Sequence, residues 1–254
     1  MQTAQQVGST IFSNHAASYE KGRPGYAPEL TRFLEQALAS SQIGADVGSG
    51  TGIFTRELLN LGKTVYALEP NPDMRIRAER ILGAREGFIS LDARAEETGL
   101  SDQSLDFITA ASSFHWLDHE AFRREALRVL RPEGEVYVIF NDRVVDDPFS
   151  REQHAICERY CPRFTSLAHG WQEAQAAFDS FFAPGYQIMA FDFPLIYDRE
   201  SFLERSYSSS YSLTQEDPEF PAYQRALEDC VDRYFPDGSV TIANVTRLCV
   251  GRPR

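Results

Sequence analysis

Apolar residues recur along the first half of the chain in two alternating patterns. Short apolar runs typical of buried strands are separated by stretches with apolar residues every three or four positions, the period of a helix. The predicted strands are Ile43 to Val47, Thr64 to Leu68, Phe88 to Leu91, Asp106 to Ala110 and Val136 to Phe140. A further helix is predicted from Glu29 to Ala39, before the first strand. Strands that alternate with helices predict a parallel, doubly wound α/β sheet.

The alternation stops after Asn141, where helices and longer β-type runs follow one another. Helices are predicted at 148–160, 171–182, 199–210 and 220–235, and β-type runs at 186–197 and 240–250. We find no repeat, low-complexity tract or flexible linker between these pieces. We therefore predict a single domain spanning 1–254. Its predicted parts are an N-terminal arm at 1–28, a core at 29–141, a helical insertion at 142–185 and a cap insertion at 198–238 before the last strand.

Three glycines at alternate positions, Gly48, Gly50 and Gly52, follow the first predicted strand. The apolar residues from Phe54 onward have helical spacing, so the glycines join a buried strand to a helix start. Glycine has no Cβ, so a ligand can lie against the peptide plane beside the unpaired N–H groups of the helix. This arrangement is typical of a nucleotide-type site.

The spacing of the glycines argues against a pyrophosphate ligand. A dinucleotide fingerprint has its third glycine three residues after the second, and that position is Ile53. Asp46, just before the first glycine, would repel phosphate and favour a cation. A ligand with a sulfonium and an amino group fits better than a nicotinamide dinucleotide.

Two other strand ends carry candidate ligand-binding residues. Glu69 follows the second strand about 20 residues after the glycines, where an acidic side chain accepts hydrogen bonds from ribose hydroxyls. The fourth strand ends in the small residues Ala111, Ser112 and Ser113, which leave room for a ligand at the carboxyl edge of the sheet.

Composition and charge exclude several classes of partner. The formal net charge is −12 and the chain has two lysines, so binding to nucleic acid is not expected. Hydrophobic residues at 43% are ordinary for a globular protein, and no apolar run approaches the roughly 20 residues of a membrane span. The N-terminal residues lack the pattern of a signal peptide. We expect a cytoplasmic protein that is a monomer or a weak homodimer and does not bind membranes.

The cysteines show no regular spacing that would predict a disulfide framework. His154, Cys157 and Cys161 would share one face of a helix. A zinc site would need a fourth ligand from elsewhere, and no second cluster supplies it. We therefore predict free thiols on a buried helix face and no bound metal.

Several motifs together resemble one enzyme family. They are Tyr19 to Pro24, Asp46 to Gly52, Leu68 to Pro70, Asp92 to Glu96, Ser113 to Trp116 and Leu127 to Glu135. With these motifs the chain resembles the type 11 group of class I S-adenosylmethionine-dependent methyltransferases, and within it the trans-aconitate methyltransferase-like proteins. The resemblance implies a Rossmann-like, seven-stranded sheet that is mostly parallel. Its last strand is antiparallel and lies beside the fifth, and helical cap insertions accompany the sheet.

The resemblance also implies S-adenosylmethionine as cofactor and assigns its contacts. Asp46, Gly48, Ser49 and Gly50 would surround the methionine part, and Glu69 would bind the ribose. Pro70 and Met74 would lie beside the adenine, Asp92 and the Ala93 backbone would meet its amino group, and Ser112 would lie under the sulfonium. Tyr19 and Arg23 would close over the cofactor from the arm.

The methyl acceptor is expected to be a small molecule. His115 is the candidate general base because its ordinary pKa lies near 6.5, but it could equally pack under the cap with Trp116. Ala111 stands where some relatives have a polar Asn, so no activating role is assigned there. Arg143, Arg205, Tyr207 and Tyr211 with Ser208 to Ser210 are hydrogen-bond donors, or a solvated helix face. By analogy with the aconitate-like group, they favour O-methylation of a small carboxylic acid. The alternatives are a non-catalytic S-adenosylmethionine-binding module and a nicotinamide-dependent oxidoreductase.

Overall fold

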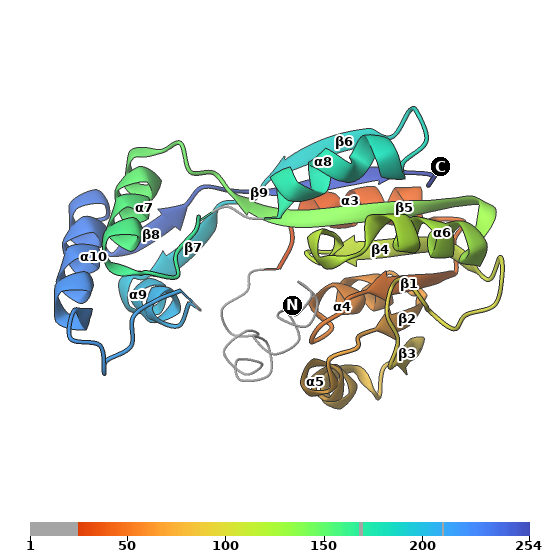
Figure 1. Ribbon diagram of the computed structural model, residues 1–254, viewed down its shortest axis with the longest axis horizontal. Coiled ribbons are helices and arrows are strands. Elements are labelled where there is room, and N and C mark those ends of the chain that lie inside the picture. Colours follow the sequence, from red (N-terminus) through yellow and green to blue (C-terminus); the bar gives the residue numbers. More distant parts are fainter. Residues whose placement is uncertain (1–24, 168–169, 210) are drawn as a thin grey trace. The chain divides into compact units, whose positions relative to one another are not determined.

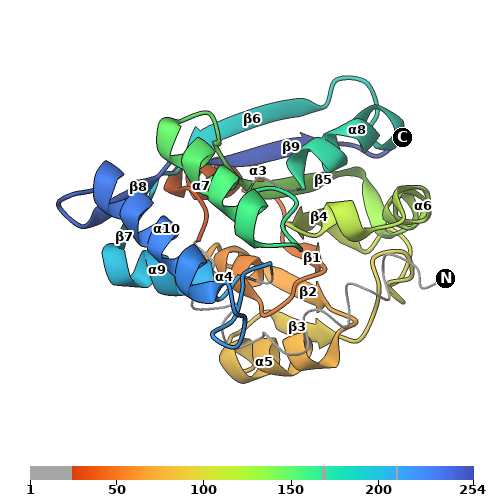
Figure 2. The same cartoon turned by 60° about the vertical axis from the view of Figure 1, so that its left-hand side comes forward.

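The computed structural model describes residues 25–167, 170–209 and 211–254. They form two compact units (Figures 1 and 2). Of the described residues, 25–141, 170–191 and 246–254 form the first unit, and 142–167, 192–209 and 211–245 form the second. The predicted helical insertion at 142–185 is thus divided between the two units. Tyr19 and Arg23 of the predicted arm lie outside the described residues.

The first unit is built on a seven-stranded sheet with the order β3-β2-β1-β4-β5-β9-β6. Its strands are β1 (Ile43–Val47), β2 (Thr64–Leu68), β3 (Phe88–Leu91), β4 (Leu105–Ala111), β5 (Leu130–Arg143), β6 (Gln187–Asp192) and β9 (Asn244–Gly251). β1 pairs in parallel with β2 and β4, β2 with β3, and β4 with β5. β9 runs in the opposite direction to its neighbour β5 (Figure 1). The predicted fold class is confirmed.

Helices cover both faces of this sheet. They are α3 (Pro28–Ala37), α4 (Ile53–Asn60), α5 (Pro72–Leu82), α6 (His119–Val129) and α8 (Trp171–Phe181). Successive side chains of β5 point to opposite faces, as the pleat of a strand requires. Val136 and Val138 pack in one core with α6 and α8, whereas Tyr137 and Ile139 pack in the other with α3, α4 and α5.

Side chains fix the ends of several helices. Asn71 caps α5 by accepting hydrogen bonds from the N–H groups of Asp73 and Met74, and Asp118 caps α6. At the end of α3, the buried Lys63 donates from Nζ to the carbonyl of Leu38 at 2.7 Å and to that of Ser41 at 2.8 Å. A cation at these carbonyls complements the helix dipole.

The structure corrects the predicted strand boundaries in the second half of the chain. The run 186–197 is interrupted at Phe193 and Pro194, giving β6 and β7 (Leu195–Asp198), and 240–250 is interrupted at Ala243, giving β8 (Ser239–Ile242) and β9. β7 and β8 pair with each other in a separate two-stranded sheet. Proline cannot donate to a strand ladder, so Pro194 is a natural place for the first break.

The second unit combines the β7–β8 sheet with three helices. These are α7 (Pro148–Tyr160), α9 (Arg199–Tyr207) and α10 (Phe220–Tyr234). Their shared core includes Phe149, Phe202, Tyr223 and Val231. Asp147 and Asp198 cap α7 and α9 by accepting hydrogen bonds from backbone N–H groups. None of the helices in the described part of the chain is long and apolar enough to cross a bilayer.

Candidate functional site

The glycine turn between β1 and α4 has a left-handed backbone at all three glycines. The φ angles are +64° at Gly48, +56° at Gly50 and +84° at Gly52, a region that strongly favours glycine. A Cβ at Gly48 would lie 2.6 Å from Cβ of Ser113, and one at Gly52 would lie 2.5 Å from Cδ1 of Leu82. Close packing against β4 and α5 therefore requires these two glycines.

Gly50 differs from the other two glycines because open space surrounds its Cα. A Cβ built there would meet no atom within 4 Å among the described residues. Next to it, the Oγ of Ser49 is buried and finds no hydrogen-bond partner in the described part of the chain. A buried hydroxyl without a partner is costly, whereas a polar ligand beside Gly50 would satisfy it. These residues fit a polar cofactor.

Asp46 lies beneath this turn and is buried. Its Oδ2 accepts a hydrogen bond from Thr55 Oγ1 of α4 at 2.7 Å, and its Oδ1 accepts one from Thr109 Oγ1 of β4 at 2.8 Å. Burial raises the pKa of Asp46 from 3.8 to about 6, although both hydroxyls act in the opposite direction. The carboxylate thus ties β1, α4 and β4 together under the glycines.

Glu69 joins the glycine turn to the end of β2. Its Oε2 accepts from the N–H of Gly50 at 2.8 Å, and its Oε1 accepts from the N–H of Asn71 at 2.8 Å. Burial raises the pKa of this carboxyl group, while the two N–H groups act in the opposite direction. Each carboxylate oxygen can accept a second hydrogen bond, so the group can still meet a diol.

The residues that follow Glu69 begin α5. Pro70 is exposed, whereas Met74 is buried. On this helix Arg75 donates from Nη1 to the carbonyl of Glu69 at 2.7 Å and from Nη2 to Oδ2 of Asp92 at 2.9 Å. Asp92 follows the end of β3, and the partly buried Ala93 packs against the core below it. The predicted ribose and adenine residues are therefore connected by one arginine.

The end of β4 contains a strained residue. Ser112 has φ of +56°, which is uncommon for a residue with a side chain, and its N–H donates to the carbonyl of Ile139 at 2.8 Å. Ser113 is buried and donates from Oγ to the carbonyl of Val47 at 2.6 Å. Such outliers are concentrated at functional sites, and this one lies where a sulfonium is predicted.

His115 lies in the 3-10 helix η1 (Phe114–Trp116), directly after the end of β4. Its ring packs against Trp116 at 4.7 Å and against Phe140 at 5.4 Å between centroids. A Cβ at Gly170 would come within 3.3 Å of Nδ1 of His115. His115 therefore belongs to an aromatic cluster of the first unit.

Sequence reasoning missed several residues that organise this site. Thr55, Thr109, Ser113 and Arg75 all hold a predicted site residue or the glycine turn in place. The partners lie between 6 and 66 residues away in the chain, and no local pattern links the pairs. The sequence indicates Ser113 only as one of the small residues that leave room for a ligand at the end of β4, and its bond to Val47 is not predicted.

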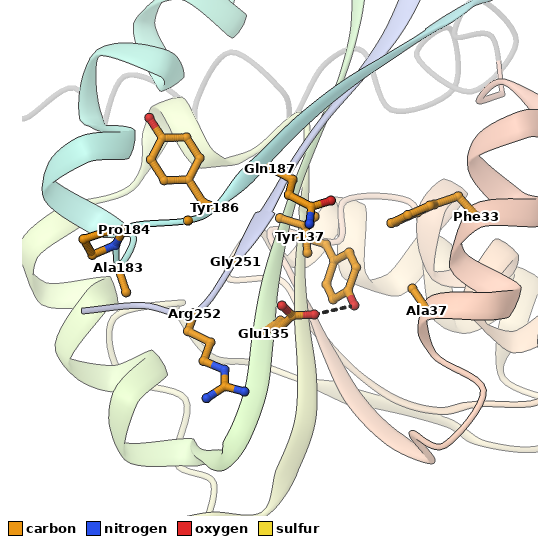
Figure 3. A pocket seen from close by; sticks show the side chains of 12 residues that line it. Phe33, Ala37, Glu135, Tyr137, Ala183, Pro184, Tyr186, Gln187, Gly251 and Arg252 are labelled. Carbon is orange, nitrogen blue, oxygen red and sulfur yellow. Dashed lines mark hydrogen bonds between the residues drawn. The ribbon is translucent and has the colours of Figure 1, made fainter.

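A cavity of about 310 Å³ in the first unit is a second candidate site (Figure 3). Its lining includes Phe33 of α3 and Tyr137 of β5. Three of the polar side chains around it are already paired: Tyr137 donates to Glu135, Tyr186 donates to Asp179, and Arg252 contacts Glu133. In the sheet register Glu135 faces Phe107, which faces Gly44 near the start of β1, so the cavity lies away from the glycine turn.

Arg143 and Arg205 of the second unit form no salt bridge with a carboxylate in the described part of the chain. Arg143 donates from Nη2 to Ser150 Oγ at 3.1 Å, and its Nε is buried with no partner among the described residues. Burial lowers the pKa of Arg143, while Tyr211 and the carboxylate of Asp147 act in the opposite direction and Arg205 acts in the same direction as burial. The guanidinium of Arg205 lies over the ring of Tyr197, 5.5 Å from its centroid.

Among the described residues, other arginines of this unit also form no salt bridge, namely Arg151, Arg159, Arg163 and Arg225. Arg143 differs from them in having a buried Nε without a partner in the described part of the chain. Arg199 and Arg233 of the same unit form salt bridges with Asp232 and Glu152. In the described part of the chain neither Arg143 nor Arg205 forms one. Two guanidinium groups left unpaired in an acidic chain can receive an anionic ligand.

The other predicted acceptor residues are used differently. Tyr211 packs edge-on against Phe164 at 5.0 Å, and burial raises its pKa. Tyr207 packs against the rings of Phe220 and Tyr223. The hydroxyls of Ser208 and Ser209 donate to the carbonyl of Arg205, so they finish helix α9, and Ser210 lies outside the described residues.

The residues considered as metal ligands have other partners. Cys157 and Cys161 are buried, and burial raises the pKa of Cys157 to about 12. His154 contacts Glu158 at 3.3 Å and packs against Phe164. Within the described ranges, no group of three or more His, Cys, Asp or Glu side chains could hold a metal ion.

Comparisons with known proteins agree on one kind of enzyme. Residues 45–138 match the family model described as a methyltransferase domain. An uncharacterised methyltransferase of Mycobacterium tuberculosis is 36% identical over 135 residues, which span 53% of this chain and 54% of that protein. The chain thus matches about half the length of this relative.

Two other relatives are covered over more of their length. An uncharacterised methyltransferase of Geobacillus kaustophilus is 31% identical over 170 residues, 62% of this chain and 76% of that protein. A solved structure of a proposed type II methyltransferase from Anaeromyxobacter dehalogenans has a TM-score of 0.69 at 20% identity. That match covers 91% of this chain and 97% of the other, and it shows a shared fold.

Proposed function

The chain belongs to the class I S-adenosylmethionine-dependent methyltransferases, and we propose that it methylates an oxygen atom of a small carboxylic acid. The observation that carries the substrate class is the pair of guanidinium groups of Arg143 and Arg205, which form no salt bridge with a carboxylate in the described part of the chain. Membership of this family argues against the two alternatives from the sequence, a nicotinamide-dependent oxidoreductase and a non-catalytic binding module.

The cofactor is proposed to bind along the glycine turn of the first unit. The open space at Gly50 and the unpartnered hydroxyl of Ser49 would receive its methionine part, with Gly48 and Asp46 shaping the turn. Glu69 would accept hydrogen bonds from the ribose. Further proposed contacts are Pro70, Met74, Asp92 and Ala93 for the adenine and Ser112 for the sulfonium, with Tyr19 and Arg23 closing from the arm.

S-adenosylmethionine supplies a methyl group on a sulfonium, a leaving group that is already activated. The protein then has to align the acceptor atom with the methyl group and exclude water. A carboxylate acceptor is ionised at neutral pH and needs no base. For such a substrate, His115 would position the acceptor or pack beneath it, whereas a hydroxyl or amine acceptor would require His115 to take a proton.

Arg143 and Arg205 are proposed to hold the acceptor by charge and geometry. A guanidinium binds a carboxylate through a planar fork of N–H donors, which fixes the orientation as well as the position of the acid. Arg143 is the more strongly desolvated of the two, as its lowered pKa indicates. A hydrogen bond from Arg143 to an anion would therefore contribute more binding free energy than one from an exposed arginine. The trans-aconitate methyltransferase-like group offers a precedent for acidic substrates.

A screen of acceptors tests this proposal. Small dicarboxylic and tricarboxylic acids, phenols and amines are incubated with S-adenosylmethionine, and S-adenosylhomocysteine is quantified. We expect activity with the acids, and a fall in kcat/KM of at least tenfold in Arg143→Ala and Arg205→Ala. Arg159→Ala is the matched control, because Arg159 is exposed on α7 and lies over Tyr160. Activity confined to neutral or cationic acceptors would contradict the substrate class and leave the family unaffected.

A further inference from the structure

Arg75 connects two strand ends that the proposed function assigns to the cofactor. It lies in the first turns of α5 and reaches the carbonyl of Glu69 with Nη1 and Oδ2 of Asp92 with Nη2, at 2.7 Å and 2.9 Å. The arginine side chain is 16% exposed, whereas that of Asp92 is 69% exposed. The arginine is therefore the fixed partner of this pair, and the aspartate is the partner that it holds.

The geometry of the pair leaves one oxygen of Asp92 available. Exposed ion pairs usually contribute little to stability because both side chains are mobile. Here a second hydrogen bond, to the Glu69 backbone, fixes the plane of the guanidinium, and so it fixes which carboxylate oxygen faces it. Oδ2 is occupied by this contact. Oδ1 has no hydrogen-bond donor in the described part of the chain and can accept one from a ligand.

A carboxylate oxygen at this point distinguishes purines by their substituent at position 6. An amino group donates a hydrogen bond to the oxygen, whereas a keto oxygen meets it with like partial charge. This discrimination requires Asp92 to stay in one rotamer. A freely rotating, exposed carboxylate would turn away from a keto group and lose most of the selectivity.

From these contacts we propose that Arg75 is a positioning residue that makes the site selective for 6-aminopurines by fixing Asp92. The inference rests on the proposed binding of the cofactor along β1, β2 and β3. Arg75 acts through Asp92 and touches no ligand itself. Its contact with the Glu69 carbonyl anchors the guanidinium and is shared by every purine ligand, so it does not contribute to the choice between them.

Calorimetry with two product analogues tests the proposal. The dissociation constants of S-adenosylhomocysteine and of its 6-oxo analogue, S-inosylhomocysteine, are measured for the wild type and for Arg75→Met, Asp92→Asn and the double variant. We expect Arg75→Met to lower the preference for the amino compound by roughly tenfold to a hundredfold, the value of a charge-assisted hydrogen bond. The double variant should show the same preference between the two compounds as Asp92→Asn.

Control variants separate positioning from general loss of structure. Arg80→Met changes an exposed arginine of the same helix and should keep the wild-type preference. Arg75→Lys keeps the charge without the planar fork and should give an intermediate preference, and it carries the test if Arg75→Met does not fold. Equal weakening of both compounds in the Arg75 variants would overturn the proposal. A wild type that binds neither compound would overturn the proposed cofactor site and this inference with it.

Discussion

Gly50 and Gly62 have the same kind of backbone but different expected roles. Their φ angles are +56° and +73°, and a Cβ at either position would meet no described atom within 4 Å. Valine should strain both turns by roughly 1 to 3 kcal/mol, because a β-branched residue disfavours positive φ. We expect Gly50→Val to abolish binding of S-adenosylhomocysteine and Gly62→Val to leave its dissociation constant unchanged. Calorimetry on the two folded variants makes the comparison.

The paired design makes the outcome interpretable. Loss of binding in both variants would mean that backbone strain alone accounts for it. Unchanged affinity in Gly50→Val would remove the cofactor from the glycine turn.

Asp46 gives the first unit a pH-dependent stability. Its pKa is about 6 in the folded protein against 3.8 in the ordinary case, so the folded state binds a proton more tightly than the unfolded state. Protonated Asp46 makes its full contribution to the free energy of unfolding below about pH 3.8. This contribution is lost as the pH rises through about 6. Above that range the ionised carboxylate costs about 3 kcal/mol.

We therefore predict that Asp46→Asn is more stable than the wild type at pH 8 by about 1 to 2 kcal/mol, after the loss of two charge-assisted hydrogen bonds. The difference should shrink towards pH 5, where the wild-type carboxyl group is mostly protonated in the folded state. Urea unfolding at both pH values measures it. A stability difference that is the same at pH 5 and pH 8 would contradict a raised pKa.

At the residue scale, the sequence predicted acidic residues at three strand ends but not how they are bonded. Asp46, Glu69 and Asp92 stand at strand ends, and a strand end is visible in a pattern of apolar residues. Their partners Thr55, Thr109 and Arg75 are ordinary residues within helices and strands. The pairs become apparent only when three-dimensional packing brings distant segments together.

Among the elements, the N-terminal cap of α5 is expected to serve both stability and binding. Asn71 caps the helix through its side chain, and its own N–H donates to Oε1 of Glu69. Asn71→Ala should lower the free energy of unfolding by about 1 kcal/mol. It should also weaken the binding of S-adenosylhomocysteine, because the loss of the cap loosens the backbone that holds Glu69.

Asp198→Ala is the matched control, since Asp198 caps α9 of the second unit through its side chain. It should cost a similar stability and leave the affinity unchanged. Thermal unfolding and calorimetry measure the two effects separately. Equal effects of both caps on affinity would show that stability alone governs the binding.

Element boundaries were predicted well where apolar residues follow a helical period. They were predicted poorly where one alternating run supplies strands to two sheets. Helices such as α7 and α10 follow the predicted ranges closely, because apolar residues recur along them at a helical spacing. The runs 186–197 and 240–250 were each read as one strand because apolar and polar residues alternate throughout. Each run in fact contributes to two sheets, and an alternating pattern is the same in both.

At the scale of the whole molecule, the division into two units predicts that a ligand bound to one unit slows hydrogen exchange mainly in that unit. A ligand that binds one unit stabilises it by RT ln(1 + [L]/Kd), about 2.7 kcal/mol at a hundredfold excess over Kd. S-adenosylhomocysteine should therefore slow hydrogen exchange of buried amides in β1, β2 and β4 by up to about a hundredfold. The interior of α10 in the second unit should change little. Exchange across 12–25 should also slow if the predicted arm closes over the cofactor.

Mass spectrometry of proteolytic fragments resolves these segments. Equal protection of α10 and β1 would show that the units open together. Unchanged exchange at 12–25, with clear protection of β1, would contradict the predicted role of Tyr19 and Arg23.

The buried position of Lys63 has a practical consequence for chemical labelling. The chain contains two lysines, Lys21 and Lys63, and Nζ of Lys63 is held by the carbonyls of Leu38 and Ser41. Acylating reagents need a free, unprotonated amine, so Lys63 should react slowly while the fold is intact. Uptake of an acyl group by Lys63 would therefore report that the first unit has opened. The reaction rate of this one amine thus serves as a chemical measure of unfolding that needs no mutation.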